Sequence, residues 1–203
     1  MLKLKKIAVT GGLAAGKTTV CQLFKELGAY VVSADEIVHQ MLSPDTVVGQ
    51  QVVSLLGSDI VSGLGIDRKK IAAKVFTHPD LLQALEKIIH PAVFDEIERR
   101  YQAILKENRY PLFIAEIPLL YEAAGEKGFN AVVSVDATSE VCRKRFMEHT
   151  SNTSEEFDRR MMRQIHSEQK AAKATFIIQN NGSLTELKDA VKFLFLQLEE
   201  SDL

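Results

Sequence analysis

The sequence predicts an α/β protein in which a five-stranded parallel sheet is covered by helices on both faces. Two observations support this class. Short apolar runs of strand length alternate with longer segments in which apolar residues recur every three or four positions. The 203 residues contain no internal repeat and no low-complexity linker, so they fit one domain that carries inserted lobes.

The predicted strands are short, apolar and bounded by polar or turn-forming residues. They comprise residues 5–10, 29–33, 110–118, 130–136 and 174–179. The first of them, KKIAVT, is closed by glycine, which is typical of a buried strand that enters a tight turn.

Helical periodicity dominates the segments between these strands. Outside the central block, the predicted helices comprise residues 17–27, 34–42, 138–149, 154–173 and 184–199. Gly28 lies just past the end of the first helix, where glycine commonly terminates helices. Ser183 and Glu186 have the spacing of a capping box and mark the start of the last helix.

The block from 47 to 107 is mostly helical and is longer than a simple crossover requires. We therefore expect a core of residues 1–42, 108–137 and 174–203, a helical lobe at about 43–107 and a mobile helical lid at about 138–173. His90-Pro91 predicts a kink or a break within the lobe, because proline cannot donate a backbone hydrogen bond.

Composition excludes several functional classes. The net charge is −2, so no global basic field indicates a nucleic-acid partner. There is no run of about 18 apolar residues and no signal-peptide pattern, so we expect no membrane association. Cys21 and Cys142 form no metal or redox spacing, which suits a reducing, cytoplasmic location. We expect a monomer or a weak homo-oligomer.

The segment GGLAAGKTT, residues 11–19, follows the first strand and fits the phosphate-loop pattern G-x4-G-K-[ST]. Backbone N–H groups of such a loop, together with the following helix N-terminus, hold phosphate oxygens. Lys17 would reach the β- and γ-phosphates, and the Thr18 hydroxyl would bind Mg²⁺. The alternative is a glycine-rich turn with an exposed lysine.

Three carboxylates follow strands at the edge where open α/β sheets bind ligands. Asp35 could orient and deprotonate a hydroxyl nucleophile, or it could cap the helix that follows. Glu116 could help to hold Mg²⁺, or it could be a simple charge at a strand end. Asp136 is better explained as a helix cap.

The predicted lid carries several arginines, among them Arg143, Arg145 and those of RRMMRQIHSEQK. Arginines on a mobile flap can stabilise charge on a transferring phosphoryl group. The alternative is a solvated helix face whose arginines pair with Glu155, Glu156 and Asp158. His90 precedes Pro91, where a histidine can simply cap or pack a helix break.

Several stretches together resemble the dephospho-CoA kinase family, nearly from end to end. They are VTGGLAAGKTTV, SADEIVHQ, IIHPAVF, EIPLLYEAA, RRMMRQ and FIIQNNGS. The resemblance implies a P-loop kinase of three α/β/α layers, with an inserted helical acceptor-binding lobe and a helical lid. It also implies transfer of a phosphoryl group from ATP, with Mg²⁺, to the ribose 3′-hydroxyl of the small molecule dephospho-CoA.

The resemblance also implies roles for individual positions. Asp35, Lys17, Arg145 and Arg160 would be catalytic. Substrate-binding positions would be Asp35, His90, Leu119, Leu120 and Glu122, and metal-binding positions Thr18 and Glu116. Positions that bind ATP would be Gly11, Gly12, Leu13, Ala14, Ala15, Gly16, Lys17, Thr18, Thr19 and, near the adenine, Asn180.

The chain departs from the family pattern at several positions. Ser33 replaces the first Asp of D-A-D, and Thr175 replaces a frequent Asp. Ala14 and Ala15 stand where Gly and Ser are usual, and a positive φ at Ala14 would carry a steric cost. His149 falls where a second lid arginine is frequent, and Glu116 stands where Asp is common.

Two other functions fit parts of the pattern. A kinase for another small molecule, such as a nucleoside or a nucleotide, would share the fold and the phosphate loop and differ in the acceptor lobe. A nucleotide-dependent switch of the GTPase type would need an N-K-x-D motif to read the base. The sequence has none, since Asn180 is followed by Asn181 and Gly182.

Overall fold

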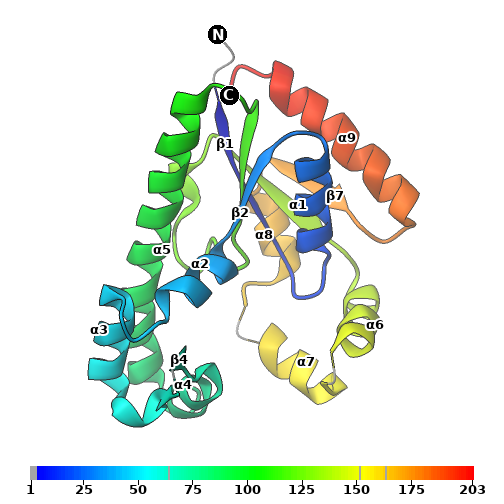
Figure 1. Ribbon diagram of the computed structural model, residues 1–203. Coiled ribbons are helices and arrows are strands. Elements are labelled where there is room, and N and C mark those ends of the chain that lie inside the picture. Colours follow the sequence, from blue (N-terminus) through cyan, green and yellow to red (C-terminus); the bar gives the residue numbers. More distant parts are fainter. Residues whose placement is uncertain (1–3, 64, 151, 163) are drawn as a thin grey trace. The chain divides into compact units, whose positions relative to one another are not determined.

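The computed structural model describes residues 4–63, 65–150, 152–162 and 164–203 (Figure 1). Leu64 of the predicted lobe, and Ser151 and Arg163 of the predicted lid, lie outside the described residues. The chain divides into two compact units, one of residues 1–33 and 101–203 and one of residues 34–100. The second unit begins and ends earlier than the lobe expected at about 43–107.

The first unit contains a parallel sheet of five strands in the order β2-β5-β1-β6-β7, which confirms the predicted sheet. Its strands are β1 (Lys5–Gly11), β2 (Tyr30–Ser33), β5 (Leu112–Glu116), β6 (Ala131–Asp136) and β7 (Phe176–Gln179). Every residue of β1 is buried, as expected for a central strand covered on both faces. Val9 pairs with Glu116, and Gly11 pairs with Val135, so the phosphate loop leaves the middle of the sheet.

Helices of the first unit cover both faces of this sheet. They are α1 (Lys17–Glu26), α6 (Ser139–His149), α7 (Ser154–Met161), α8 (Ser167–Lys173) and α9 (Leu184–Glu200), with the 3-10 turn η2 (Glu126–Gly128). In the sheet order, β2 lies to one side of β1, and β7 lies to the opposite side of β6. The connections β1–α1–β2 and β6–α8–β7 therefore run across the sheet in opposite directions. Since parallel crossovers are right-handed, α1 and α8 lie on opposite faces. The α9 helix packs beside α1 (Figure 1), with the rings of Phe24 and Phe195 6.4 Å apart.

Side-chain caps mark the starts of α6 and α7 in the lid region, whereas α8 has none. The predicted helix 154–173 is two helices, because α7 ends at Met161 and α8 begins at Ser167. The interpretation of Asp136 as a helix cap is wrong. The hydroxyl of Thr138 accepts the capping hydrogen bond from the Val141 N–H at the start of α6. The capping box of Ser183 and Glu186 at the start of α9 is confirmed.

Lys5 joins the first strand to the end of the last helix. Its side chain is buried, and its ammonium group donates hydrogen bonds to the carbonyls of Leu198 (2.7 Å), Glu199 (2.9 Å) and Ser201. The last carbonyls of a helix lack partners within the helix and carry partial negative charge. A buried cation is therefore satisfied at this position, and the C-terminal end of α9 is held against the sheet.

The second unit is mainly helical and has its own apolar core. Its elements are α2 (Ala34–Met41), α3 (Val47–Leu56), η1 (Ser58–Ile60), β3 (Val61–Ser62), β4 (Gly65–Ile66), α4 (Arg68–Val75) and most of α5 (Pro79–Glu107). Val52, Ile60, Ile71 and Leu85 are among the buried residues of this core. The sequence analysis did not anticipate the short antiparallel pair of β3 and β4.

The α5 helix continues through His90 and Pro91, so the alternative of a break at this dipeptide is wrong. Pro91 is exposed, while Leu85, Val93 and Ile97 on either side of it are buried. The missing backbone hydrogen bond costs about 3 kcal/mol or more in a helix interior. Burial of several large apolar side chains on the same helix offsets this cost, since each contributes about 1.5–3 kcal/mol.

Within the second unit, an ionic network connects α5 with α2. The Glu96 carboxylate accepts hydrogen bonds from Arg99 Nε and Arg100 Nε, each at 2.7 Å. Arg100 Nη2 also donates to Gln40 Oε1 at 2.8 Å. Hydrogen bonding to Arg99, with a further contribution from Arg100, lowers the pKa of Glu96 to about 2. The network thus holds α2, the helix that carries Asp35, against α5.

We expect Glu96→Gln to lower the free energy of unfolding at pH 7 by about 1 kcal/mol, a modest value because solvent screens ion pairs near the surface. The folded-state pKa lies below the ordinary value of 4.5, so the contribution is complete above that pH and is lost as pH falls toward 2. Urea denaturation of both proteins at pH 7 and pH 2.5 measures the effect. An equal difference at both values would contradict the ionic explanation.

Every helix of the described ranges is too short or too polar to cross a membrane.

Candidate active site

The loop between β1 and α1 has the backbone conformation of an anion cradle. Gly11 and Gly16 have positive φ angles of 146° and 98°. A Cβ atom at Gly11 would overlap the carbonyl oxygen of Val135 on the neighbouring strand, so glycine is required there. The α1 helix follows directly, and its first turn contains no acidic residue. Its positive end is therefore available to an anion.

Ala14 adopts a positive φ of 57° in this loop. The sequence analysis expected a steric cost for this conformation, and the loop adopts it nevertheless. A left-handed conformation costs a residue with a Cβ atom about 1–2 kcal/mol. The surrounding loop fixes this residue, as is usual where backbone strain persists at ligand sites.

Replacing Ala14 with glycine should raise the free energy of unfolding by about 0.5–1 kcal/mol, because glycine adopts a positive φ without the steric cost. Ala15 is the matched control, since its φ is not positive and it is buried next to Ala14. Ala15→Gly should lower the stability instead. Urea denaturation of the three proteins measures both changes, and destabilisation by Ala14→Gly would contradict the prediction.

Lys17 and Thr18 begin α1 and point polar groups at the loop and the sheet edge. Lys17 Nζ donates hydrogen bonds to the carbonyls of Gly12 (2.8 Å) and Gly11 (3.3 Å). Thr18 Oγ1 donates to Glu116 Oε1 at 2.8 Å. Glu116 is buried at the end of β5, so it is more than an exposed charge at a strand end. A cation and a hydroxyl–carboxylate pair thus flank the N-terminus of α1.

This pair suits a magnesium ion. A hydroxyl and a carboxylate are both hard oxygen donors, and Mg²⁺ in phosphate sites uses one or two such protein ligands together with phosphate oxygens and water. The Thr18 hydroxyl orients the Glu116 side chain, so the two oxygens lie 2.8 Å apart.

Cys21, one turn further along α1, does not add a nucleophile to this site. Burial raises the pKa of its thiol well above the usual value, and the nearby Glu116 carboxylate raises it further. The reactive form of cysteine is the thiolate. Both cysteines are buried and unbonded to each other, in agreement with structural roles.

Asn180, which follows β7, forms a hydrogen bond with the phosphate loop. Its Nδ2 donates to the Ala15 carbonyl at 2.8 Å, and the residue is buried. Its backbone carbonyl accepts a hydrogen bond from Arg145 Nη1 at 2.9 Å. A Cβ atom at Gly16 would overlap the Asn180 amide, so the second glycine permits this close approach. Asn180 therefore holds both the phosphate loop and a lid arginine in place.

A cavity of about 450 Å³ opens beside the loop. It is lined by Leu13, Ala14, Gly16, Thr19, Arg145, Phe146, His149, Thr150, Arg160, Asn180, Gly182, Leu184 and Leu187. Basic side chains come from α6 and α7, and apolar side chains come from the loop, α6 and α9. A mostly apolar wall with a few charged groups is typical of a small-molecule site. His149, one of the departures from the family pattern, lies in this wall.

Among the lid arginines that the structure describes, Arg143, Arg159 and Arg160 form ion pairs, as the alternative explanation expected. Arg143 Nη2 pairs with Asp158 at 2.6 Å, and Arg160 Nε pairs with Glu156 at 3.0 Å. Arg160 also lies over the Phe146 ring, 5.5 Å from its centre, and lines the cavity. Arg145 and Arg160, the two arginines that the resemblance makes catalytic, both line the cavity. Arg143 instead stabilises the contact of α6 with α7.

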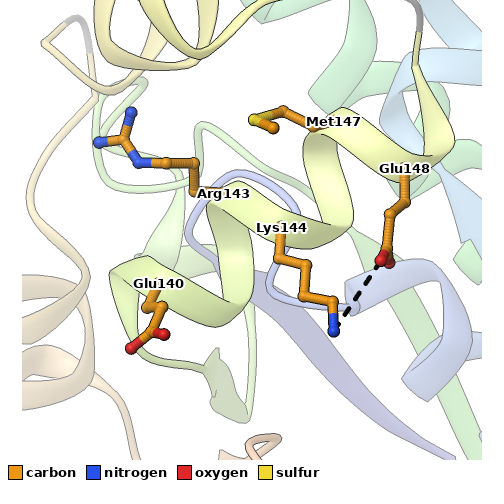
Figure 2. Close-up of a pocket in the computed structure, with 5 residues that line it drawn as sticks. All are labelled: Glu140, Arg143, Lys144, Met147 and Glu148. Atoms are coloured by element: carbon orange, nitrogen blue, oxygen red, sulfur yellow. Dashed lines mark ion pairs between the residues drawn. The ribbon is translucent and has the colours of Figure 1, made fainter.

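A second depression lies over the outer face of α6 (Figure 2). Its five lining residues all belong to this one helix, and Lys144 faces Glu148 at 4.0 Å. In Figure 2 the other side chains, Glu140, Arg143 and Met147, extend in separate directions. A binding site needs groups that converge from several elements. This depression is a feature of the helix surface.

Comparison with known proteins identifies the family. A family model described as dephospho-CoA kinase matches residues 5–186. A dephospho-CoA kinase from Protochlamydia amoebophila is 50% identical over 200 residues, which cover 98% of each chain. The chain belongs to the dephospho-CoA kinase family. A solved dephospho-CoA kinase from Campylobacter jejuni is 27% identical with a TM-score of 0.72 over 98% of each chain. A solved protein from Thermus thermophilus is 30% identical with a TM-score of 0.80, covering 96% of this chain and 98% of that one.

The positions that match the family's acceptor side fall in both units. Asp35 and His90 belong to the second unit. Asp35 is exposed and is the second residue of α2, inside the helix, so it is not the residue that caps it. His90 is half-buried in α5 and does not mark a helix break.

The remaining positions of the family's acceptor side follow β5 in the first unit. Leu119 is partly exposed, whereas Leu120 is fully buried. Glu122 is largely buried and forms an ion pair with Lys170 of α8 at 2.8 Å. The sequence analysis missed Lys170, since a lysine within SEQKAAK looks like part of a solvated helix face. The hydroxyl of Thr10, which donates to the Pro118 carbonyl at 3.3 Å, was also missed.

Proposed function

We propose that this chain transfers the γ-phosphoryl group of ATP to the ribose 3′-hydroxyl of dephospho-CoA, the last step of coenzyme A synthesis. Family membership over residues 5–186 is the observation that carries the proposal. The fastened phosphate loop and the basic cavity beside it supply the parts that phosphoryl transfer needs, namely positioning and stabilisation of charge. We place the enzyme in the cytoplasm, as a monomer or a weak homo-oligomer.

In this proposal the ATP phosphates occupy the loop of residues 11–19. The backbone N–H groups and the N-terminus of α1 hold the β-phosphate, and Lys17 exchanges its contacts with the Gly11 and Gly12 carbonyls for phosphate oxygens. The base occupies the adjoining cavity near Asn180. Arg145 and Arg160 reach the same cavity and neutralise charge that develops on the transferring group.

Asp35 acts on the acceptor in this proposal. The residue lies two positions beyond Ser33, which pairs with Glu116 across β2 and β5. Asp35 orients the 3′-hydroxyl and accepts its proton as the new bond forms between the 3′-oxygen and the γ-phosphorus. The bond from the γ-phosphorus to the bridging oxygen breaks, and ADP leaves with that electron pair.

Thr18 and Glu116 would hold Mg²⁺ in this enzyme. When bound, the ion neutralises charge on the phosphate oxygens. The lid residues contribute by closing over the cavity and excluding water, which limits unproductive hydrolysis of ATP.

An acceptor panel tests the proposal. Purified protein is incubated with γ-labelled ATP and dephospho-CoA, a nucleoside, a nucleotide or shikimate, and ADP release and labelled products are measured. Strong preference for dephospho-CoA, with the label on the ribose 3′-oxygen, is expected. Equal or better transfer to another acceptor would show a different small-molecule kinase. ADP release without transfer to any acceptor would overturn the assignment as a kinase of small molecules.

A further inference from the structure

Lys170 of α8 is a fully buried cation whose position follows from specific contacts. None of its surface is exposed. Its ammonium group donates a hydrogen bond to the Pro118 carbonyl at 2.8 Å and pairs with Glu122 Oε1 at the same distance. A buried charge without partners is strongly unfavourable. The buried Lys170 ammonium group therefore needs both of these contacts.

The Pro118 carbonyl joins three parts of the first unit. It accepts hydrogen bonds from Lys170 of α8 and from the hydroxyl of Thr10, the residue before Gly11. Pro118 itself begins the segment PLLYE, residues 118–122, after β5. A single carbonyl oxygen thus receives donors from the strand that enters the phosphate loop and from the last helix of the lid region.

Glu122 extends the connection to the segment between α7 and α8. Its Oε1 atom also accepts a hydrogen bond, at 3.0 Å, from the backbone N–H of Ile165, which lies between α7 and α8. Within the described part of the chain, its Oε2 atom is buried and has no hydrogen-bond partner. The carboxylate therefore depends on the contacts of Oε1, and loss of the ammonium group would leave a buried charge poorly compensated.

We propose that Lys170 is a positioning residue which fixes the PLLYE segment, the phosphate-loop strand and the lid attachment at Ile165 relative to one another. This inference rests on the proposed function, because the segment matches the family's acceptor side. Lys170 touches no substrate in this account. It acts through Pro118 and Glu122. The PLLYE segment and the backbone at Ile165 therefore keep one geometry while the rest of the lid moves.

The consequence is a specific kinetic pattern. Misplacement of a reacting group by about 1 Å can lower a rate about a hundredfold. Loss of Lys170 should therefore lower kcat/KM for dephospho-CoA by up to about that factor. The dissociation constant of ATP should stay near the wild-type value, because the contacts of the phosphate loop with Asn180 do not involve Lys170.

The experiment compares Lys170→Met, Glu122→Gln, their double variant and Lys5→Met. Lys5→Met is the matched control, since Lys5 is also a buried lysine bonded to backbone carbonyls but lies at the far end of α9. Glu122→Gln keeps an oxygen for the Ile165 N–H and removes the buried charge, so the double variant should fold even where Lys170→Met alone does not. The measurements are transfer kinetics, ATP affinity and hydrogen–deuterium exchange.

We expect Lys170→Met and the double variant to lower kcat/KM for dephospho-CoA and to speed exchange at Ile165 and residues 118–124. The double variant should lose less than the sum of the single losses, because both changes break one contact. The inference is overturned if the losses add fully, if exchange there is unchanged, or if Lys5→Met has the same kinetic effect. Absence of transfer in the wild type would overturn the proposed function, whereas the exchange data would still decide the role of Lys170.

Discussion

Lys17→Ala is expected to lower the rate of phosphoryl transfer by on the order of a thousandfold or more. The Lys17 ammonium group lies at the start of α1 and donates hydrogen bonds to the Gly11 and Gly12 carbonyls. From this position it can contact the γ-phosphoryl group while negative charge develops on that group. Alanine is a good helix former, so the fold should persist. Single-turnover transfer from labelled ATP to dephospho-CoA measures the effect.

Lys25→Ala is the control for this prediction, because Lys25 is an exposed lysine in the last turn of the same helix. It should retain wild-type transfer, and thermal unfolding should show both variants folded. Full activity of Lys17→Ala would refute the role of the phosphate loop in the reaction.

Asp35→Asn should lower kcat by about a hundredfold to ten-thousandfold, the range that general-base catalysis contributes. Asparagine keeps the size of the side chain but cannot accept the hydroxyl proton. ATP binding should be unchanged, because the loop and its contacts with Asn180 are intact. Rapid-quench kinetics with saturating dephospho-CoA, together with equilibrium titration of ATP, separate the two quantities.

Glu36→Gln is the control here, since Glu36 is the other acidic residue in the first turn of α2, where carboxylates interact favourably with the helix dipole. It should have nearly wild-type kcat. If Asp35→Asn weakened ATP binding and turnover together, or if Glu36→Gln matched its loss, a structural role at the helix start would explain Asp35 better.

The sheet could be predicted because its three central strands are buried on both faces and therefore read as mostly apolar runs. KKIAVT and LFIAE are such runs, and both are fully buried. The phosphate loop could also be predicted, because its pattern places glycine where the backbone needs a positive φ and lysine where a side chain can reach phosphate oxygens. The expected proximity of Thr18 and Glu116 follows from the parallel register of β1 and β5.

Other features depend on long-range packing and could not be predicted locally. The local effect of Pro91 favours a break, but buried residues on both sides keep α5 continuous. Lys170 has the sequence context of a solvated residue, and its partners Pro118 and Glu122 lie about fifty positions away. Which lid arginines pair with acids likewise depended on how α6 and α7 meet.

The central place of β1 affects how the chain is made. The strand is synthesised before the rest of its sheet, and its sheet neighbours are residues 112–116 and 131–136. At about 5–20 residues per second, its first neighbour is synthesised roughly 5–20 s later. Until then the apolar KKIAVT segment has no strand to join and is a target for chaperones or for aggregation. Lys5 can meet the carbonyls of α9 only after residues 198–201 have been synthesised, so this contact is among the last to form in the first unit.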